Sequence, residues 1–133
     1  MIRNGHTKGI VATKSDGGIW LPHSVPHFPI YNSTSTEFGY PLGGLINGQM
    51  FLCISIPISQ VDNVGEILQY TKPDLYGSQV PKEMETKLPK FLAAINNATV
   101  TSPPWFKQFA FNGGQYPFKV FVKGPKFHRG TQL

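Results

Sequence analysis

Hydrophobic and polar positions alternate in two short segments near the start of the chain, which predicts a β-hairpin. The segments are HTKGIVAT, residues 6–13, and IWLPHS, residues 19–24, and KSDGG lies between them. Asp16, Gly17 and Gly18 supply the turn chemistry and the freedom for positive φ that a tight connection needs. The pattern therefore favours two antiparallel strands joined by a short turn.

The pairing register of this hairpin decides which side chains share a face. If the turn closes on residues 14–17, Thr13 pairs with Gly18 and Lys8 pairs with His23. A slip of one residue would send His23 to the opposite face. The sequence leaves this choice open.

Two further segments read as a loop and a strand. Residues 26–47 are rich in Pro, Ser, Thr and Gly and show little periodicity, which is typical of a long surface loop. GQMFLCISIPI, residues 48–58, is a continuous apolar run of strand length. Such a run predicts a strand covered on both faces.

Two helices are expected after this strand. Ser59 can cap the first, with Asp62 in its first turn. A second, shorter helix starts with Pro89 in its first turn. The apolar positions expected to face the core are Val61, Val64, Ile67 and Leu68 in the first helix and Phe91, Leu92 and Ile95 in the second.

The final third of the chain predicts a second hairpin. PWFKQFAF and YPFKVFVK are of strand type, and Asn112, Gly113 and Gly114 lie in the turn between them. Strands, hairpins and interleaved helices indicate an α/β (α+β) fold, a mixed β-sheet flanked by short helices. With 133 residues the chain forms one domain at most.

Composition narrows the class of protein. Forty per cent of the residues are hydrophobic and only 14% are charged, which suits a packed core. No stretch reaches the ~18 consecutive apolar residues of a membrane-spanning helix, so no membrane partner is expected. No signal peptide is recognisable, and because the candidate site begins at residue 6 we expect further sequence upstream.

Charge is distributed unevenly along the chain. Residues 1–85 hold five Lys or Arg and all seven Asp or Glu, a balance of −2, whereas residues 86–133 hold seven Lys or Arg and no acid, a balance of +7. A basic half of this kind attracts polyanions such as nucleic acids. It is equally compatible with a solubilising surface.

Two N-glycosylation sequons, at Asn32 and Asn97, point to the secretory pathway. The single cysteine, Cys53, lies in an apolar run, where a buried and inert thiol is the default expectation. In a secreted protein an odd cysteine instead suggests a partner outside this chain.

The segment GHTKG, residues 5–9, carries the most suggestive chemistry. In a strand, His6 and Lys8 emerge on the same face about 6–7 Å apart. Lys8 can neutralise a phosphodiester oxygen, and neutral His6 can attack the phosphorus. A second, protonated group must then give a proton to the leaving alkoxide. In the register given above, His23 shares that face.

Longer motifs around these residues resemble the deoxyribonuclease II family. GHTKG is followed by DGGIWLPHSVPHFP and then by GQMFLCISIPI. The resemblance is most specific over residues 4–70, and it implies a phospholipase D-like fold and metal-free cleavage of DNA at acid pH that leaves 3′-phosphate ends. It further implies a lysosomal or secreted protein.

The resemblance also assigns roles to individual residues. His6 and Lys8 match the family's first His-x-Lys motif, and His23 matches a histidine that the family places close by. Cys53 matches a cysteine that the family bonds to one near its mature amino terminus, and no such partner is present here. No cofactor is implied, and the seven carboxylates form no tight cluster that would suggest a metal site.

Only one His-x-Lys motif is present, whereas the family's fold faces two across a pseudo-twofold axis. His128 is followed by Arg129 and Gly130 and does not complete a second motif. Residues 1–133 are therefore expected to be a partial domain resembling the family's amino-terminal half. Either two copies pair as a homodimer with a composite site, or the chain is an incomplete member that binds DNA or a partner protein.

The aromatic residues of the basic half have two interpretations. They can stack nucleic-acid bases, with Lys107, Lys119 and Lys123 as phosphate contacts. At alternating strand positions most of them are more simply core residues. The set comprises Trp105, Phe106, Phe109, Phe111, Tyr116, Phe118 and Phe121.

Overall fold

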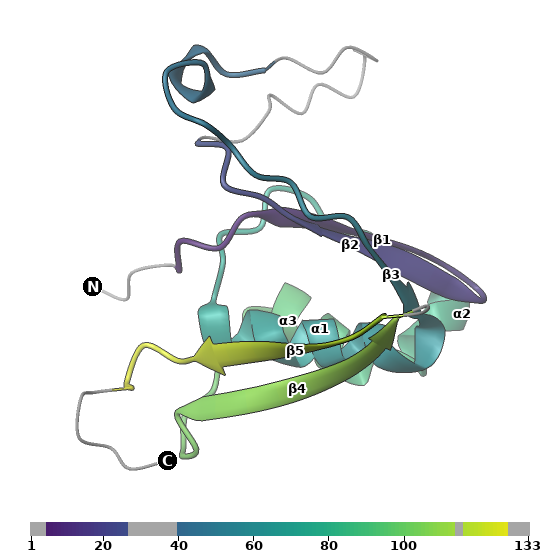
Figure 1. The fold of residues 1–133 in the computed structure, drawn as a ribbon. Coiled ribbons are helices and arrows are strands. Elements are labelled where there is room, and N and C mark those ends of the chain that lie inside the picture. Colours follow the sequence, from purple (N-terminus) through teal and green to yellow (C-terminus); the bar gives the residue numbers. More distant parts are fainter. Residues whose placement is uncertain (1–4, 27–39, 114–115, 128–133) are drawn as a thin grey trace.

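A three-stranded antiparallel sheet carries the amino-terminal motifs in the computed structural model, which describes residues 5–26, 40–113 and 116–127 (Figure 1). The strands are β1 (Gly9–Lys14), β2 (Gly17–Pro22) and β3 (Ile54–Pro57), in the order β1-β2-β3. The first two form the predicted hairpin.

The register of this hairpin is the one that pairs Lys8 with His23. Thr13 pairs with Gly18 at the turn, and the backbone N–H of His23 donates to the carbonyl of Lys8 at 3.0 Å. Gly18 permits the close approach, because a Cβ there would lie 2.6 Å from the carbonyl oxygen of Ala12. Of the registers that the sequence leaves open, the structure has the one that places His23 on the same face as Lys8.

Strand pairing divides the sheet into two unlike faces. Trp20 and Ile56 are buried on the inner face, where Val11 packs against them. Ile10 and Ile19 point to the outer face and are 43% and 41% exposed. We call these the inner and outer faces of the three-stranded sheet.

Helix α1 (Ile58–Thr71) follows β3 directly and packs on the inner face. Val61, Val64 and Ile67 are buried, as their spacing predicts, and Leu68 is half-buried. The prediction that Ser59 caps the helix is wrong. The helix begins two residues earlier than a Ser59 cap would place it, with Pro57 in extended conformation at the N-cap, because the strand runs straight into it.

Asp62 of α1 accepts hydrogen bonds from the first turn of another helix. Its Oδ1 accepts hydrogen bonds from the backbone N–H groups of Lys90 and Phe91 at 2.8 and 3.0 Å, which caps the free amino end of α3 (Pro89–Ile95).

Helix α3 is less buried than the sequence predicts. Pro89 occupies the first turn as expected, but only Ala94 of this helix is fully buried. The apolar side chains expected in the core there, Phe91, Leu92 and Ile95, are half-buried. A four-residue helix, α2 (Lys82–Glu85), was not predicted.

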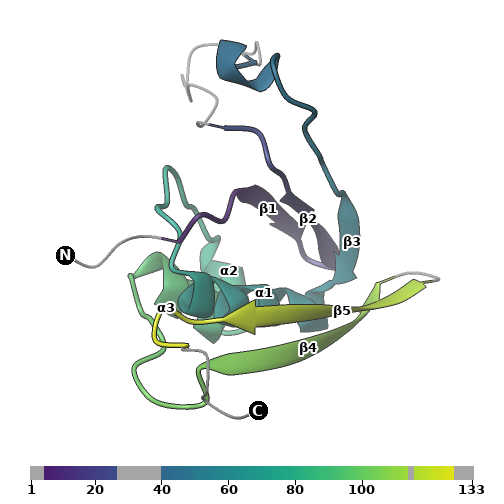
Figure 2. The ribbon, with the colours of Figure 1, turned by 60° about the vertical axis from the view of Figure 1, so that its left-hand side comes forward.

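The second hairpin, β4 (Phe106–Gly113) and β5 (Tyr116–Lys123), completes the core. Phe111 is fully buried; its ring stacks on Phe118 at 5.0 Å and meets Trp20 at 6.0 Å. Figures 1 and 2 show this hairpin and the helices together on one side of the three-stranded sheet. The combination of α and β elements agrees with the predicted class, but the expected single mixed β-sheet is wrong: the described strands form two separate antiparallel sheets.

The long apolar run at residues 48–58 does not form the expected strand. Only Ile54–Pro57 is a strand, extended by a single bridge between Phe51 and His23. Met50, Phe51 and Leu52 are 58%, 49% and 50% exposed. Burial on both faces is wrong because residues 50–52 are exposed on alternating sides, so the described elements cover neither face of this segment. In the expected loop, residues 27–39 and His27 lie outside the described residues, and Leu42–Gly44 forms a 3₁₀ turn.

Gly65 sets how closely α1 and α3 approach. A Cβ at Gly65 would lie 2.3 Å from the backbone N and Cα of Phe91. We expect Gly65→Ala to lower the free energy of unfolding by about 2 kcal/mol or more, because the helices must move apart. Urea denaturation measures this, with Gly77→Ala as the control, since nothing lies within 4 Å of that position. Equal stability of the two variants would contradict this packing.

Candidate active site

Lys8 and His23 lie side by side where the β1–β2 hairpin leaves the sheet. Their backbones are joined by the 3.0 Å hydrogen bond described above, and cross-strand neighbours project on the same face. That face is the outer one. His6 is exposed and precedes Lys8 by two residues, in a segment that is not a regular strand. Its side-chain direction therefore stays a prediction.

Two glycines fix the path of the His-Thr-Lys segment. Gly5 donates its N–H to the carbonyl of Lys72 at 2.7 Å, and a Cβ on Gly5 would stand 1.7 Å from the carbonyl oxygen of Thr71. A Cβ on Gly9 would stand 2.9 Å from the carbonyl oxygen of Leu21. The segment is thus held between the carboxyl end of α1 and β2. At both glycines of GHTKG a side chain would clash with this neighbouring backbone.

His23 is held by hydrogen bonds on the residue that follows it. The Ser24 hydroxyl donates to Oε1 of Gln49 at 2.7 Å and accepts the N–H of Met50 at 2.9 Å. The N–H of Ser24 donates to the Met50 carbonyl at 3.0 Å. Ser24 and Gln49 lie in motifs that the sequence singles out, but only the structure shows that they bind each other. They position His23 rather than act themselves.

The surroundings of the His23 ring favour its neutral form. The ring lies against Phe51, with centroids 5.5 Å apart. Burial, and then the positive charge of Lys8, lower the pKa of His23 below its ordinary value of 6.5. The Nδ1 atom is buried and has no hydrogen-bond partner within the described part of the chain. A buried polar atom of this kind calls for a partner such as a bound ligand.

The predicted phosphate contacts lie elsewhere. Lys119 and Lys123 are exposed on β5, and Lys107 of β4 forms an ion pair with Glu66 of α1. Hence the structure places these lysines on the second hairpin, apart from Lys8 and His23.

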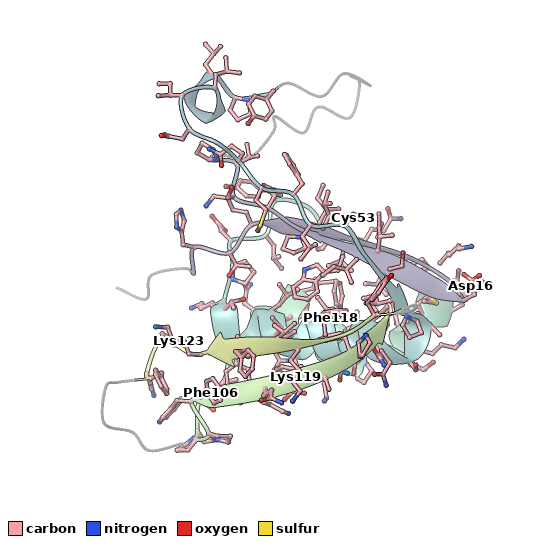
Figure 3. The ribbon with its side chains drawn as sticks, in the orientation of Figure 1. Asp16, Cys53, Phe106, Phe118, Lys119 and Lys123 are labelled. Atoms are coloured by element: carbon pink, nitrogen blue, oxygen red, sulfur yellow. The ribbon has the colours of Figure 1, made fainter. Side chains whose placement is uncertain are left out.

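The other predicted positions are on the surface or outside the described residues. Asn97 is exposed just after α3, and Asn32 and His128 fall outside the described ranges. Cys53 is exposed, so the expectation of a buried thiol is wrong; the outer face has no cover in the described residues (Figure 3).

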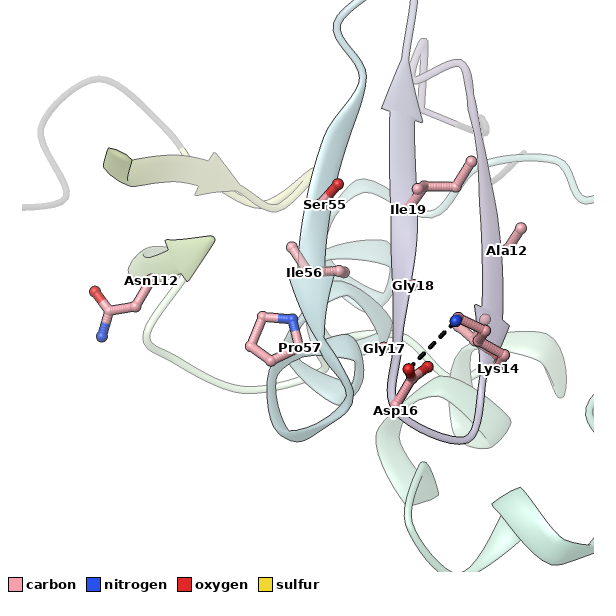
Figure 4. Close-up of a pocket in the computed structure, with 11 residues that line it drawn as sticks. Ala12, Lys14, Asp16, Gly17, Gly18, Ile19, Ser55, Ile56, Pro57 and Asn112 are labelled. Atoms are coloured by element: carbon pink, nitrogen blue, oxygen red, sulfur yellow. Dashed lines mark ion pairs between the residues drawn. The ribbon is translucent and has the colours of Figure 1, made fainter. Parts of the chain in front are cut away.

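An open pocket occupies the opposite end of the first hairpin (Figure 4). Lys14 and Asp16, which form an ion pair at 3.2 Å, line it together with Ser55 and Asn112. None of His6, Lys8 and His23 contributes to it.

In the described ranges, no three His, Cys, Asp or Glu side chains stand close enough to hold a metal ion. No helix there is long and apolar enough to cross a membrane.

An imidazole beside an ammonium group on an exposed face suits a phosphodiester. The ammonium of Lys8 can bind a non-bridging oxygen as a point charge. His23 can transfer a proton, because an imidazole titrates closer to neutrality than any other unperturbed side chain. The pair thus offers one group that can stabilise negative charge and one that can transfer a proton.

Comparison with known proteins identifies one family. The model of the family Deoxyribonuclease II matches residues 2–131. Plancitoxin-1 of Acanthaster planci is 40% identical over 78% of this chain, and Deoxyribonuclease-2-alpha of Mus musculus is 37% identical over 93%. Deoxyribonuclease-2 of Caenorhabditis elegans is 30% identical over 93% of the chain.

The matches cover only part of each relative. They span 28% of Plancitoxin-1, 35% of the mouse protein and 32% of the nematode protein, so the chain corresponds to about a third of their length. No solved structure matches the chain.

The pairing of Lys8 with His23 makes a prediction about proton binding. We expect the pKa of His23 to lie below 6.5 and to rise in Lys8→Met, because the variant removes a positive charge but keeps the aliphatic stem. NMR titration of the histidine ring protons measures this. Lys14→Met, at the other end of the hairpin, is the control and should leave the value unchanged. A pKa of His23 that stays the same or falls in Lys8→Met would disprove the pairing.

The same shift predicts how stability depends on pH. Because the folded chain binds the His23 proton less readily than the unfolded chain, this group's contribution to stability is complete above pH 6.5 and is lost as the pH falls through the folded pKa. Substitution His23→Phe should therefore weaken the loss of stability below pH 6.5 in thermal unfolding. An unchanged pH profile would contradict the lowered pKa.

Proposed function

The chain belongs to the deoxyribonuclease II family, and from this premise we propose that it cleaves DNA phosphodiester bonds at acid pH without a metal ion. The observation that carries the proposal is the Lys8–His23 pair on the exposed outer face, with the Nδ1 atom of His23 buried and unpartnered in the described residues. A phospholipase D-like half domain is the fold we propose for it.

We assign the nucleophile to His6 and the phosphate contact to Lys8. The neutral imidazole of His6 attacks phosphorus, so that an N–P bond forms and the bond from phosphorus to the 5′ oxygen breaks. Lys8 stabilises the charge that develops on the non-bridging oxygens. The DNA keeps its 3′ oxygen on phosphorus, which gives 3′-phosphate ends after hydrolysis.

His23 is the proposed general acid. Its imidazolium gives a proton to the departing 5′ oxygen, and the neutral ring then takes a proton from the water that attacks the phosphohistidine. Because burial and Lys8 lower the pKa of His23, the charged form needs an acidic solution. A bound phosphodiester brings negative charge to the pair and makes protonation easier.

A complete site is proposed to need a second His-x-Lys motif. Two copies of the chain are the simplest source, with each contributing His6 and Lys8 to a composite site. The outer face suits such an association, because Ile19 and Phe51 are exposed there.

The alternative is a catalytically incomplete member that binds DNA or a partner protein. It is favoured by the presence of one His-x-Lys motif in a chain that spans about a third of its relatives.

We further propose a lysosomal or secreted location, in accordance with the acidic working pH. Asn32 and Asn97 are the proposed glycan sites. Cys53, exposed and unpaired within the described ranges, is proposed to form a disulfide with a cysteine outside this chain.

A plasmid-nicking assay tests the cleavage. At acid pH with a chelator present, the chain should convert supercoiled DNA to the nicked form, and His6→Ala should lower the rate at least about a thousandfold, because the nucleophile is lost. Lys14→Ala, a basic residue away from the pair, should retain the rate. No nicking without metal would favour the binding alternative, and equal nicking by His6→Ala would contradict cleavage through His6.

Sizing of the active protein tests the composite site. Light scattering in the assay buffer should give the mass of two chains, since each supplies one motif. A strictly monomeric protein with full activity would contradict the composite site while leaving the roles of His6, Lys8 and His23 intact.

A further inference from the structure

The face of the β4–β5 hairpin that points away from the core has an unusual composition. In β4, residues on this face alternate with the buried Phe109 and Phe111. In β5, Lys119 is exposed, whereas its neighbour Phe118 is half-buried and points inward (Figure 3). We call it the outer hairpin face. Its members are Phe106, Gln108 and Ala110 of β4 and Lys119, Phe121 and Lys123 of β5.

Aromatic rings form a row along this face. Phe121 is 63% exposed, and its ring stacks on Phe106 with centroids 6.4 Å apart and planes at 24°. Phe106 in turn lies 6.1 Å from Phe127. The sequence could not separate these rings from core rings, whereas the structure assigns Phe109, Phe111 and Phe118 to the core and leaves this row at the surface.

The lysines beside the rings are free of carboxylates. Lys119, Lys123 and Lys126 make no ion pair within the described residues, and residues 86–133 contain no acid. Lys123 lies 5.9 Å above the Phe127 ring and Lys126 lies 5.0 Å above Trp105. In contrast, Lys107 on the inner side forms an ion pair with Glu66, which also pairs with Lys90. Positive charge is therefore concentrated where the rings are exposed.

We propose that the outer hairpin face binds single-stranded nucleic acid. Bases stack on Phe121 and Phe106, and Lys119 and Lys123 contact the phosphates on either side. Positions 119, 121 and 123 follow one another every second residue, about 6–7 Å apart, on one strand. Flat rings offer their faces to unpaired bases, which a duplex keeps stacked inside, so the surface selects a single strand.

This surface leads toward the active site. Gly124, which follows Lys123, lies against Tyr70 in the last turn of α1, and Gly5 lies against Thr71 in the same turn. Figures 1 and 2 both show the end of β5 and the amino-terminal segment on the same side of the molecule. The end of the outer hairpin face and the His-Thr-Lys segment thus both approach the last turn of α1. The proposal rests on the proposed function for the choice of polymer, but it needs no catalysis.

Binding of a short fluorescent thymidine oligomer, followed by anisotropy in a His6→Ala background, tests the proposal apart from cleavage. Phe121→Leu should weaken binding roughly 5- to 150-fold, the range for loss of one stacked base, whereas Phe121→Tyr should retain it. Changing Lys119 and Lys123 to Ala should reduce the slope of log affinity against log salt by about 1.4, because each phosphate contact contributes about 0.7.

The matched control replaces Lys82 and Lys87, in and just after α2, by Ala. It removes the same net charge and should leave the slope unchanged. Equal effects of the two lysine pairs, tighter binding of duplex that ignores Phe121, or binding only to anionic lipid vesicles would each overturn the proposal. Nicking activity, whether present or absent, leaves this outcome unaffected.

Discussion

The hydrogen bond from the N–H of His23 to the carbonyl of Lys8 is the constraint on which the candidate site depends. It carries the β1–β2 register one pair beyond the strands, and period-two alternation then brings both side chains to the outer face. The Ser24–Gln49 hydrogen bond and the approach of Gly5 to α1 hold the flanks of this pair. These contacts fix the backbones of Lys8 and His23 next to each other at the end of the hairpin strands.

The core lies on one side of the three-stranded sheet only. Trp20, α1 and the β4–β5 hairpin fill the inner face, and the outer face keeps Ile10, Ile19 and Phe51 exposed on the side of the Lys8–His23 pair. An apolar face next to a proposed catalytic pair is a surface that a second copy or another part of a longer protein would cover. The exposure of Cys53 has the same cause.

Local chemistry made much of the fold predictable from the sequence. The turn at Ser15 and Asp16, followed by Gly17 and Gly18 at the start of β2, set the hairpin. The spacing of Val61, Val64 and Ile67 set the buried side of α1. The sequence could not show that residues 50–53 lie open, because an apolar run predicts burial without telling which neighbours exist. Nor could it show that Asp62 caps α3 or that Phe121 faces solvent, since both depend on contacts between distant segments.

The central claim is that His6 is the nucleophile and His23 the acid, and a diester with a good leaving group separates these roles. Thymidine 3′-(p-nitrophenyl phosphate) releases a phenolate that needs little protonation, so the acid becomes dispensable while the nucleophile does not. The account predicts that His23→Ala releases the first equivalent of nitrophenolate nearly as fast as the unmodified chain, although it fails on DNA and turns over slowly because the base of the second step is lost. His6→Ala should release none in this first turnover and should fail on DNA. A normal first turnover of the nitrophenyl ester in His6→Ala, or an equal loss in the first turnover of both substrates in His23→Ala, would contradict the account.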